Sequence, residues 1–190
     1  MFDGCGRLRF WHLVLGCALM AVALTSAGNA APKAKVKMSR AVAVSVVNLP
    51  WRGVKNGWGP VEMNGSNGGE LVHDGKPLRI NNKRYALGFG CHVASEIEVP
   101  LNGRYGSFVC DIGFDDDVKW QKPVDRKTRA VFKVFADNRQ LFDSGPMTAN
   151  TPTKTIRVGV RGKKLLRLVV RPIGDGRNGH VDWANPRLLP

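Results

Sequence analysis

The sequence of 190 residues is short of acidic side chains. It has 15 Asp and Glu against 29 Lys and Arg, which gives a formal net charge of +14 at pH 7. A positive field of this size attracts anions such as acidic polysaccharides, anionic envelope surfaces or nucleic acids. No motif that reads nucleic acid is recognisable, so we expect no nucleic-acid partner. Solubility alone is the simpler explanation for the charge.

The chain also lacks the short motifs of common catalytic sites. It contains no Gly-x-Ser-x-Gly nucleophile motif, no zinc signature and no EF-hand calcium loop. No internal repeat and no convincing helical period are visible. A hydrolase that uses Glu62 with one of the carboxylates at 115–117 is the remaining enzymatic alternative. We expect a protein that is not an enzyme.

No apolar run reaches the roughly 20 residues of a membrane-spanning helix. The longest, at 10–24, follows Arg7 and Arg9 and precedes a stretch of small residues. This order of segments is typical of a secretory signal peptide, with an uncleaved anchor as the alternative. We predict a signal peptide at 1–30, a basic linker with a possible first strand at 31–48, and no membrane span after cleavage. The expected location is secreted, periplasmic or at the cell envelope.

Few cysteines remain once the predicted signal is removed, namely Cys91 and Cys110. An oxidising compartment allows such a pair to form a disulfide. A hairpin of 95–101 with 105–112 would place the two about 16 Å apart at the usual rise of a strand. A disulfide needs Cα atoms within about 7 Å. The sequence therefore favours two buried thiols, although a bend at Gly90 leaves pairing open.

Short apolar segments separated by turn residues fill the rest of the chain. Paired strands are expected around 81–82, 102–103, 137–138 and 161–163. Around the last turn, apolar side chains alternate with arginines, and the expected polyanion-binding face consists of Arg157, Arg161, Arg167 and Arg171. Alternation of this kind is typical of a two-layer antiparallel fold. The pattern predicts an all-β protein with an apolar core.

An ordered set of motifs lies between 56 and 188. It comprises Asn-Gly-Trp-Gly-Pro-Val-Glu at 56–62, Ser-Asn-Gly-Gly at 66–69, Gly-Phe-Gly-Cys-His at 88–92, Asp-Ile-Gly-Phe-Asp-Asp-Asp at 111–117, Asp-Ser-Gly at 143–145, Gly-Asp-Gly at 174–176, and His-Val-Asp-Trp-Ala-Asn-Pro-Arg-Leu at 180–188. As a set, the motifs resemble the NPCBM family of carbohydrate-binding modules, which are appended to secreted glycoside hydrolases. The basic stretch 120–129 departs from the family pattern.

The resemblance implies one domain at 49–190, an antiparallel β-sandwich of the jelly-roll, galactose-binding-like type. It also implies a non-catalytic module that recognises glycans, with galactose-type termini as the expected ligands. His92 is the best candidate for bonding a sugar hydroxyl, and contact with loop backbone is its alternative role. Trp58 offers an aromatic plane or a loop anchor, and Glu62 offers carboxylate oxygens to hydroxyls.

The carboxylates at 111–117 are the second group of candidates. Asp115 and Asp116 are predicted to contact sugar, with a turn held by salt bridges as the alternative. Asp182 and Glu62 are the candidate metal ligands, because a buried carboxylate needs a partner. Related sandwiches carry structural calcium, so a calcium ion is the expected cofactor.

Two further functions stay open at this point. One is a basic adhesion protein that binds acidic polysaccharide or envelope polymers through the arginine-bearing face. The other is an accessory subunit of a separate glycoside hydrolase. Salt separates the first from a neutral-sugar site, because binding by counterion release weakens steeply as salt rises.

Overall fold

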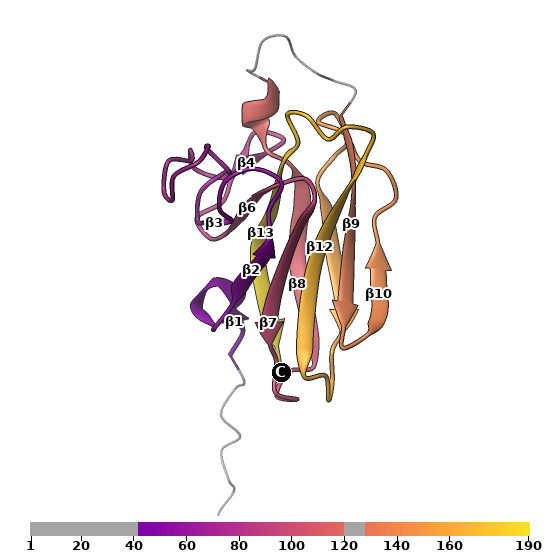
Figure 1. The fold of residues 1–190 in the computed structure, drawn as a ribbon. Helices are drawn as coiled ribbons and strands as arrows, with labels where there is room; N and C mark the ends of the chain where they lie inside the picture. The colour runs from indigo at the N-terminus through magenta and orange to yellow at the C-terminus, as the bar shows by residue number, and fades with distance from the viewer. Residues whose placement is uncertain (1–41, 120–127) are drawn as a thin grey trace, which may run out of the picture. The chain divides into compact units, whose positions relative to one another are not determined.

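The computed structural model describes residues 42–119 and 128–190 (Figure 1). The predicted signal peptide at 1–30, the linker as far as residue 41, and residues 120–127 of the basic stretch lie outside these ranges. Strands dominate the described residues, with two short 3-10 helices, η1 (Val46–Asn48) and η2 (Asp116–Lys119). No helix in these ranges is long and apolar enough to cross a membrane.

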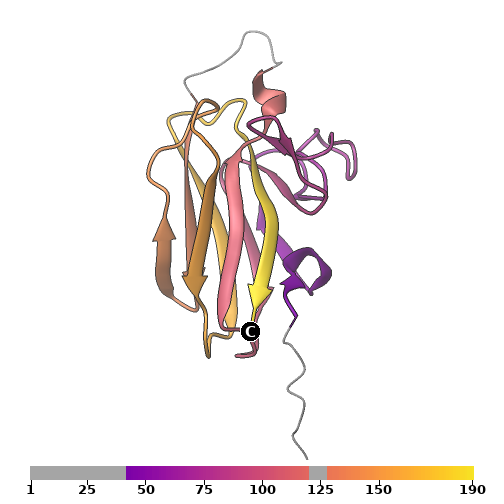
Figure 2. The ribbon, with the colours of Figure 1, turned by 180° about the vertical axis from the view of Figure 1, so that it is seen from behind.

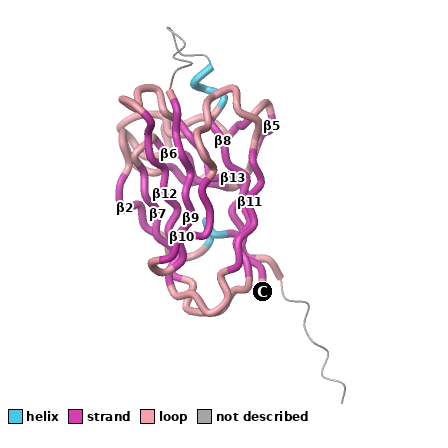
Figure 3. Tube along the Cα trace, turned by 90° about the vertical axis from the view of Figure 1, so that its right-hand side faces the viewer, coloured by secondary structure: helices cyan, strands magenta, loops and turns pink. Residues whose placement is uncertain are grey.

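Two antiparallel sheets form the predicted β-sandwich, shown from behind in Figure 2 and from the side in Figure 3. Sheet A has the order β11 (Lys154–Gly159), β8 (Ser107–Phe114), β13 (His180–Leu189), β6 (Gly88–His92) and β3 (Glu62–Met63), and β1 (Val44–Ser45) pairs with β13. Sheet B has the order β10 (Arg139–Asp143), β9 (Arg129–Ala136), β12 (Leu165–Ile173), β7 (Ser95–Pro100) and β2 (Arg52–Lys55). A small hairpin joins β4 (Arg79–Ile80) to β5 (Lys83–Arg84).

The core fills the space between the two sheets. Trp183 of sheet A packs edge-on against Phe132 of sheet B, with ring centroids 5.2 Å apart, and both side chains are fully buried. The strand alternation thus works as predicted, since Trp183 faces inward while its neighbour Asp182 faces the other side of the sheet. Burial of such large aromatic groups contributes much of the stability of the sandwich.

The domain begins earlier than the predicted residue 49. The possible first strand within 31–48 is present as the two residues of β1, and the chain then turns through η1. Val46 and Val47 are buried in the core, and β1 pairs with the last strand of sheet A. The segment 44–48 is therefore part of the folded domain rather than of a linker.

Two of the four expected hairpins are confirmed and two are wrong. The turns at 81–82 and 137–138 join β4 to β5 and β9 to β10, and Asp137 has the positive φ of 54° that such turns require. The turns at 102–103 and 161–163 instead carry the chain from one sheet to the other. The two crossings hydrogen-bond to each other, for example from Gly103 N to Lys163 O at 2.8 Å.

Because the hairpin predicted at 161–163 does not form, the arginines predicted to share one face lie on different sheets. Arg157 lies on β11 of sheet A, whereas Arg167 and Arg171 lie on β12 of sheet B. Arg167 and Arg171 both form ion pairs with Glu96 of their own sheet, at 3.1 and 3.8 Å. The alternation was correct, but strands consecutive in the sequence belong to different layers. The four arginines therefore do not form one surface.

The two cysteines are free and buried, as the sequence favours. The reason differs from the expected one, because β7 and β8 do not pair. Cys91 lies on β6 and Cys110 on β8, and β13 separates these strands in sheet A. Burial raises the pKa of the Cys110 thiol well above its usual value.

A long segment at 64–85 covers the outer side of sheet A. No side chain projects from the outer face of the sheet at Gly88, Gly90 and Gly113. A Cβ at Gly113 would collide with Ile80, and one at Gly90 with the backbone at 65–67. The glycines of the Gly-Phe-Gly-Cys-His motif therefore allow this segment to lie directly on the strands.

Candidate carbohydrate-binding site

A tight loop at 56–60 follows β2 at one end of the sandwich. The side-chain amide of Asn56 donates to the carbonyls of Trp58 and Pro60 at 2.7 and 2.8 Å. Asn67 donates to the same two carbonyls at 3.0 and 3.1 Å. The Asn56 oxygen also accepts the backbone N–H of His92 at 2.9 Å. One amide therefore fixes the loop and ties it to the end of β6.

The two glycines that flank Trp58 are required by close contacts. A Cβ at Gly57 would lie 2.9 Å from Nδ1 of His92 and would collide with the carbonyl of Val93. Gly59 has a φ of 57°, and a Cβ there would collide with the carbonyl of Gly69. The loop backbone at Gly57 therefore rests against His92, and Trp58, the next residue in the loop, is half exposed at 50%.

His92 is paired with a second histidine. Its partner across the β6–β13 ladder is His180, and the two rings meet edge-on with centroids 5.5 Å apart. Nδ1 of His180 lies 3.0 Å from Oδ2 of Asp117, which comes from η2. Loop 56–60, the end of β6, the start of β13 and η2 thus converge at one end of the sandwich. We call the surface formed by Trp58, His92 and His180 the rim.

The surroundings of His92 favour its neutral form. Burial lowers the pKa of the His92 imidazole, and the neighbouring His180 lowers it further, while the carbonyl of Val93 acts in the opposite direction. A neutral imidazole has one N–H donor and one acceptor nitrogen. Nδ1 lies 3.4 Å from the Val93 carbonyl, which favours the proton on Nδ1 and leaves Nε2 as an acceptor for a hydroxyl.

The rim combines the two groups that sugar recognition needs. An exposed indole presents an apolar plane to the C–H face of a pyranose ring, and a neutral imidazole exchanges hydrogen bonds with hydroxyls. His92 and Trp58, predicted from separate motifs, are thus brought together. The hydrogen bonds from Asn56 and Asn67 fix the loop backbone that carries Trp58, and Asn56 also ties this loop to the backbone of His92.

Glu62 lies away from the rim and is nearly inaccessible, with 2% of its surface exposed. Both of its oxygens accept the backbone N–H of His73, at 2.8 and 2.9 Å. His73 has a φ of 66°, so this carboxylate holds a loop in a conformation that side chains rarely adopt. These contacts do not support the predicted sugar contact and give Glu62 a structural role.

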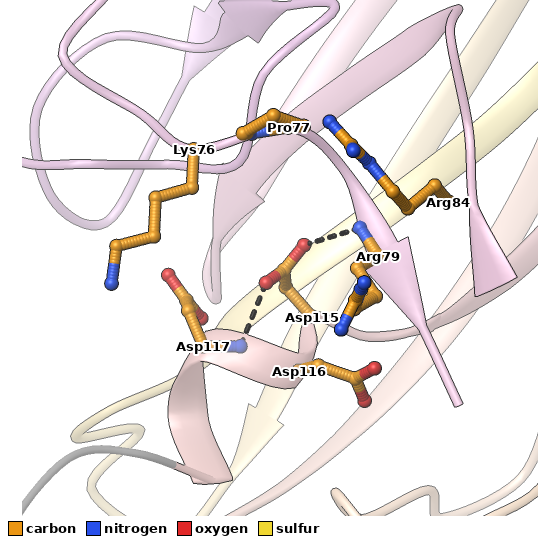
Figure 4. Close-up of a pocket in the computed structure, with 7 residues that line it drawn as sticks. All are labelled: Lys76, Pro77, Arg79, Arg84, Asp115, Asp116 and Asp117. Atoms are coloured by element: carbon orange, nitrogen blue, oxygen red, sulfur yellow. Dashed lines mark hydrogen bonds between the residues drawn. The ribbon is translucent and has the colours of Figure 1, made fainter. Parts of the chain in front are cut away.

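Asp115 and Asp116 are also committed to backbone groups. Asp115 accepts the N–H of Arg79 at 3.0 Å and that of Asp117 at 2.8 Å (Figure 4). Asp116 accepts the N–H of Asn82 at 2.7 Å. Both are 2% exposed. The two carboxylates therefore fasten the β4–β5 hairpin to the end of β8, which does not support the predicted sugar contact.

Asp182 is fully buried and faces the outer side of sheet A between Gly90 and Gly113. No N–H or hydroxyl of the described residues donates to either of its oxygens. Burial raises the pKa of Asp182 well above its usual value, and the neighbouring Asp115 raises it further. Burial also raises the pKa of Asp115, whereas the backbone N–H groups of Arg79 and Asp117 lower it, so the two buried carboxyl groups disfavour each other's ionisation.

The candidate metal ligands do not combine into a site. Glu62 and Asp182 flank Gly90 from opposite neighbouring strands, so one strand lies between them. Within 42–119 and 128–190, no group of three or more His, Cys, Asp or Glu side chains is placed to hold a metal ion. The calcium ion expected from the sequence stays a prediction, and no carboxylate cluster among the described residues supports it.

The sequence interpretation missed four residues. His180 is part of the rim as the partner of His92, and the other three support the rim, namely Asn56, Asn67 and Asp117. Asn56 and Asn67 lie within motifs that were singled out, but their hydrogen bonds reach backbone at positions that only the fold brings near. The meeting of His92 with His180 depends on the pairing of β6 with β13, which the sequence does not display.

Known proteins resemble this chain over the whole sandwich. The family model described as the NPCBM/NEW2 domain matches residues 43–189. A protein of Renibacterium salmoninarum named as an endo-alpha-N-acetylgalactosaminidase is 36% identical over 145 residues, which is 75% of this chain but only 9% of that protein. The chain thus corresponds to a small part of this relative.

Solved structures agree with this match. The CBM51 module of Clostridium perfringens GH95, in complex with methyl-galactose, is 29% identical, with a TM-score of 0.65 over 77% of this chain and 99% of that one. The CBM51-2 and INT domains of Clostridium perfringens ZmpB, in complex with GlcNAc, give 26% identity and a TM-score of 0.68 over 78% of this chain and 31% of that one. The chain therefore belongs to the NPCBM/NEW2 domain family and is a non-catalytic carbohydrate-binding module.

Proposed function

We propose that the rim binds a terminal hexopyranose of the galactose type on a glycan. The observation that carries this proposal is the contact of the loop backbone at Gly57 with His92, because it brings the half-exposed Trp58, the next residue in the loop, near an imidazole whose pKa is lowered. A pyranose can stack one face on the indole while its hydroxyls bond to His92. The two relatives bound to methyl-galactose and to GlcNAc support a ligand of this size and class.

The module acts by placing a glycan next to another activity. The relative from Renibacterium salmoninarum is about ten times longer than the matched segment and is named for a glycosidase activity. Association with a separate glycoside hydrolase, at the cell envelope or outside the cell, follows as part of the proposal. The predicted signal peptide at 1–30 supports this location.

Binding of methyl-galactoside and of GlcNAc to the purified protein tests the proposal, with titration calorimetry in about 0.1 M and 1 M salt. We expect saturable binding of one of the two sugars that barely responds to salt, because the sugar is neutral. The His92→Ala variant should lose it. An exposed histidine, His73, with 73% of its side chain accessible, provides the control variant His73→Asn, because asparagine tolerates the positive φ of this residue. The absence of binding to both sugars at millimolar concentration would contradict the proposal.

A further inference from the structure

A pocket of about 330 Å³ lies between the β4–β5 hairpin and η2 (Figure 4). Three basic side chains line it, from Lys76, Arg79 and Arg84, together with Pro77 and the carboxylates of 115–117. The sequence motifs did not single out these basic residues. Their side chains form no ion pair or hydrogen bond among the described residues.

The two arginines stand directly opposite each other. Arg79 and Arg84 are partners in the antiparallel register of β4 and β5. Like charges in such cross-strand pairs repel and destabilise the pair. Their neighbours do not relieve this, because Asp115 and Asp116 accept backbone N–H groups and are buried at the base of the pocket. The third carboxylate, Asp117, contacts His180 through Oδ2, and its Oδ1 is buried, so the exposed hydrogen-bonding groups of the pocket are the donors of the three basic side chains.

One residue links the pocket to the rim. Asp117 lines the pocket and also contacts Nδ1 of His180 at 3.0 Å. His180 in turn packs against His92. Asp117 therefore lies between the lining of the pocket and the two histidines of the rim.

We infer that this pocket is an accessory subsite for an anionic group, a carboxylate or a sulfate, on the glycan that the rim binds. Guanidinium groups bind both anions through paired, charge-assisted hydrogen bonds, and two opposed arginines gain most from such a ligand. The inference rests on the proposed function and narrows its ligand to acidic glycans. It also moves the expected polyanion contact from the sheet arginines to the β4–β5 hairpin.

Three oligosaccharides of similar length test the subsite by titration calorimetry at low salt. They are a neutral galacto-oligosaccharide, an oligogalacturonate that carries carboxylates, and a sulfated galactan fragment. We expect the protein to bind at least one acidic ligand about fivefold or more tightly than the neutral one, as a partly screened ion pair allows. The acidic ligand that shows this preference identifies the anionic group.

The double variant R79Q/R84Q should abolish the preference and leave the affinity for the neutral ligand within about twofold. Arg79 contacts Asp115 only through its backbone N–H, which the substitution keeps. The matched control is R139Q/R161Q, which removes two exposed charges away from the pocket. Circular dichroism and urea unfolding check that both variants fold.

Three results would overturn the subsite. The protein shows no preference for acidic ligands, the preference survives in R79Q/R84Q, or R139Q/R161Q loses it equally. Each can occur while the neutral ligand still binds, which leaves the proposed function intact. Failure of the unmodified protein to bind the neutral oligosaccharide would contradict the proposed function instead.

Discussion

The rim and the carboxyl cluster around Asp182 are built from similar polar side chains but differ in where their hydrogen bonds go. In the cluster, which comprises Asp115, Asp116 and Asp182, the first two bond to backbone N–H groups, and the pKa of the fully buried Asp182 is raised by burial and by the neighbouring Asp115. On the rim, Trp58 is half exposed and His92 keeps a ring nitrogen available. A polar group can bind a ligand only where the fold leaves part of its bonding capacity unused.

The difference follows from what covers each region. The segment 64–85 lies over the outer face of sheet A, so every carboxyl group beneath it needs an internal partner. No such segment covers the indole of Trp58. The cluster therefore contributes stability and the rim contributes recognition. Substitutions in the two regions should separate these effects.

The largest expected effect is on stability and comes from the cluster. Asp115→Ala removes the acceptor for the N–H groups of Arg79 and Asp117 and the partner of Asp182. We expect the free energy of unfolding to fall by about 3 kcal/mol, since each buried donor left unpaired costs 1–3 kcal/mol. Urea unfolding measures this. Asp115→Asn keeps an acceptor oxygen and should lose less, and an unchanged midpoint in the alanine variant would contradict the account.

On the rim, the largest expected effect is on affinity. His92→Ala should weaken binding of methyl-galactoside about 20-fold or more, because it removes a hydrogen-bonding group of about 2 kcal/mol from the site. The free energy of unfolding should change by less than about 1 kcal/mol. Calorimetry and urea unfolding on the same preparation separate the two. A large loss of stability with unchanged affinity would place His92 with the cluster instead.

Loss of the indole should have a smaller effect on affinity. Trp58→Ala should weaken sugar binding about tenfold, because stacking on an aromatic plane is worth about 1 kcal/mol beyond simple burial. Trp58→Phe keeps a plane and should recover most of this loss. Tryptophan fluorescence and calorimetry report the change. Equal affinity in the alanine variant and the unmodified protein would exclude the indole from the site.

Asp182→Asn should raise stability at neutral pH by on the order of 1 kcal/mol, because it removes the cost of keeping a buried carboxyl protonated. The pKa of Asp182 is raised in the folded protein, so the native state holds a proton that the unfolded chain releases above about pH 4. Stability from this group is therefore complete at low pH and declines as pH rises. Unfolding from pH 4 to 8 should show this decline in the native protein and a flatter profile in the variant. A steeper decline in the variant than in the native protein would contradict the raised pKa of Asp182.

The pH dependence of sugar binding should be the smallest effect near neutrality. Because the pKa of His92 lies below the usual 6.5, its imidazole stays neutral at pH 7 and through the start of acidification. Affinity should be constant from pH 8 to about 6.5 and should fall at lower pH, when the ring gains a proton. A titration series at fixed salt measures this. Affinity that rises on acidification would mean that the charged ring binds the ligand.

Much of the fold could be predicted from short-range pattern. Apolar alternation placed Trp183 in the core, and Asn or Asp at positive φ marked the turns at 81–82 and 137–138. The turns at 102–103 and 161–163 look the same in sequence but lead from one sheet to the other. A local pattern cannot distinguish a hairpin from such a crossing, since both place alternate side chains inward.

Local sequence pattern also predicted only part of the candidate site. His92 and Trp58 lie in short motifs of unusual composition, and the family resemblance drew attention to them. Whether a carboxylate binds sugar or backbone depends on partners far away in sequence, as with Asp116 and Asn82. Glu62, Asp115 and Asp116 therefore had the correct chemistry for a ligand site but bond to backbone.

An amide chemical-shift titration of the labelled protein with methyl-galactoside tests the central claim most directly. The account predicts that the Trp58 indole N–H and the amides of Gly57, His92 and Gly179 shift together and saturate. Amides of the cluster, such as those of Asp115 and Asp116, should move little. Saturable shifts confined to the cluster or to sheet B, with the Trp58 and His92 signals unchanged, would contradict the account.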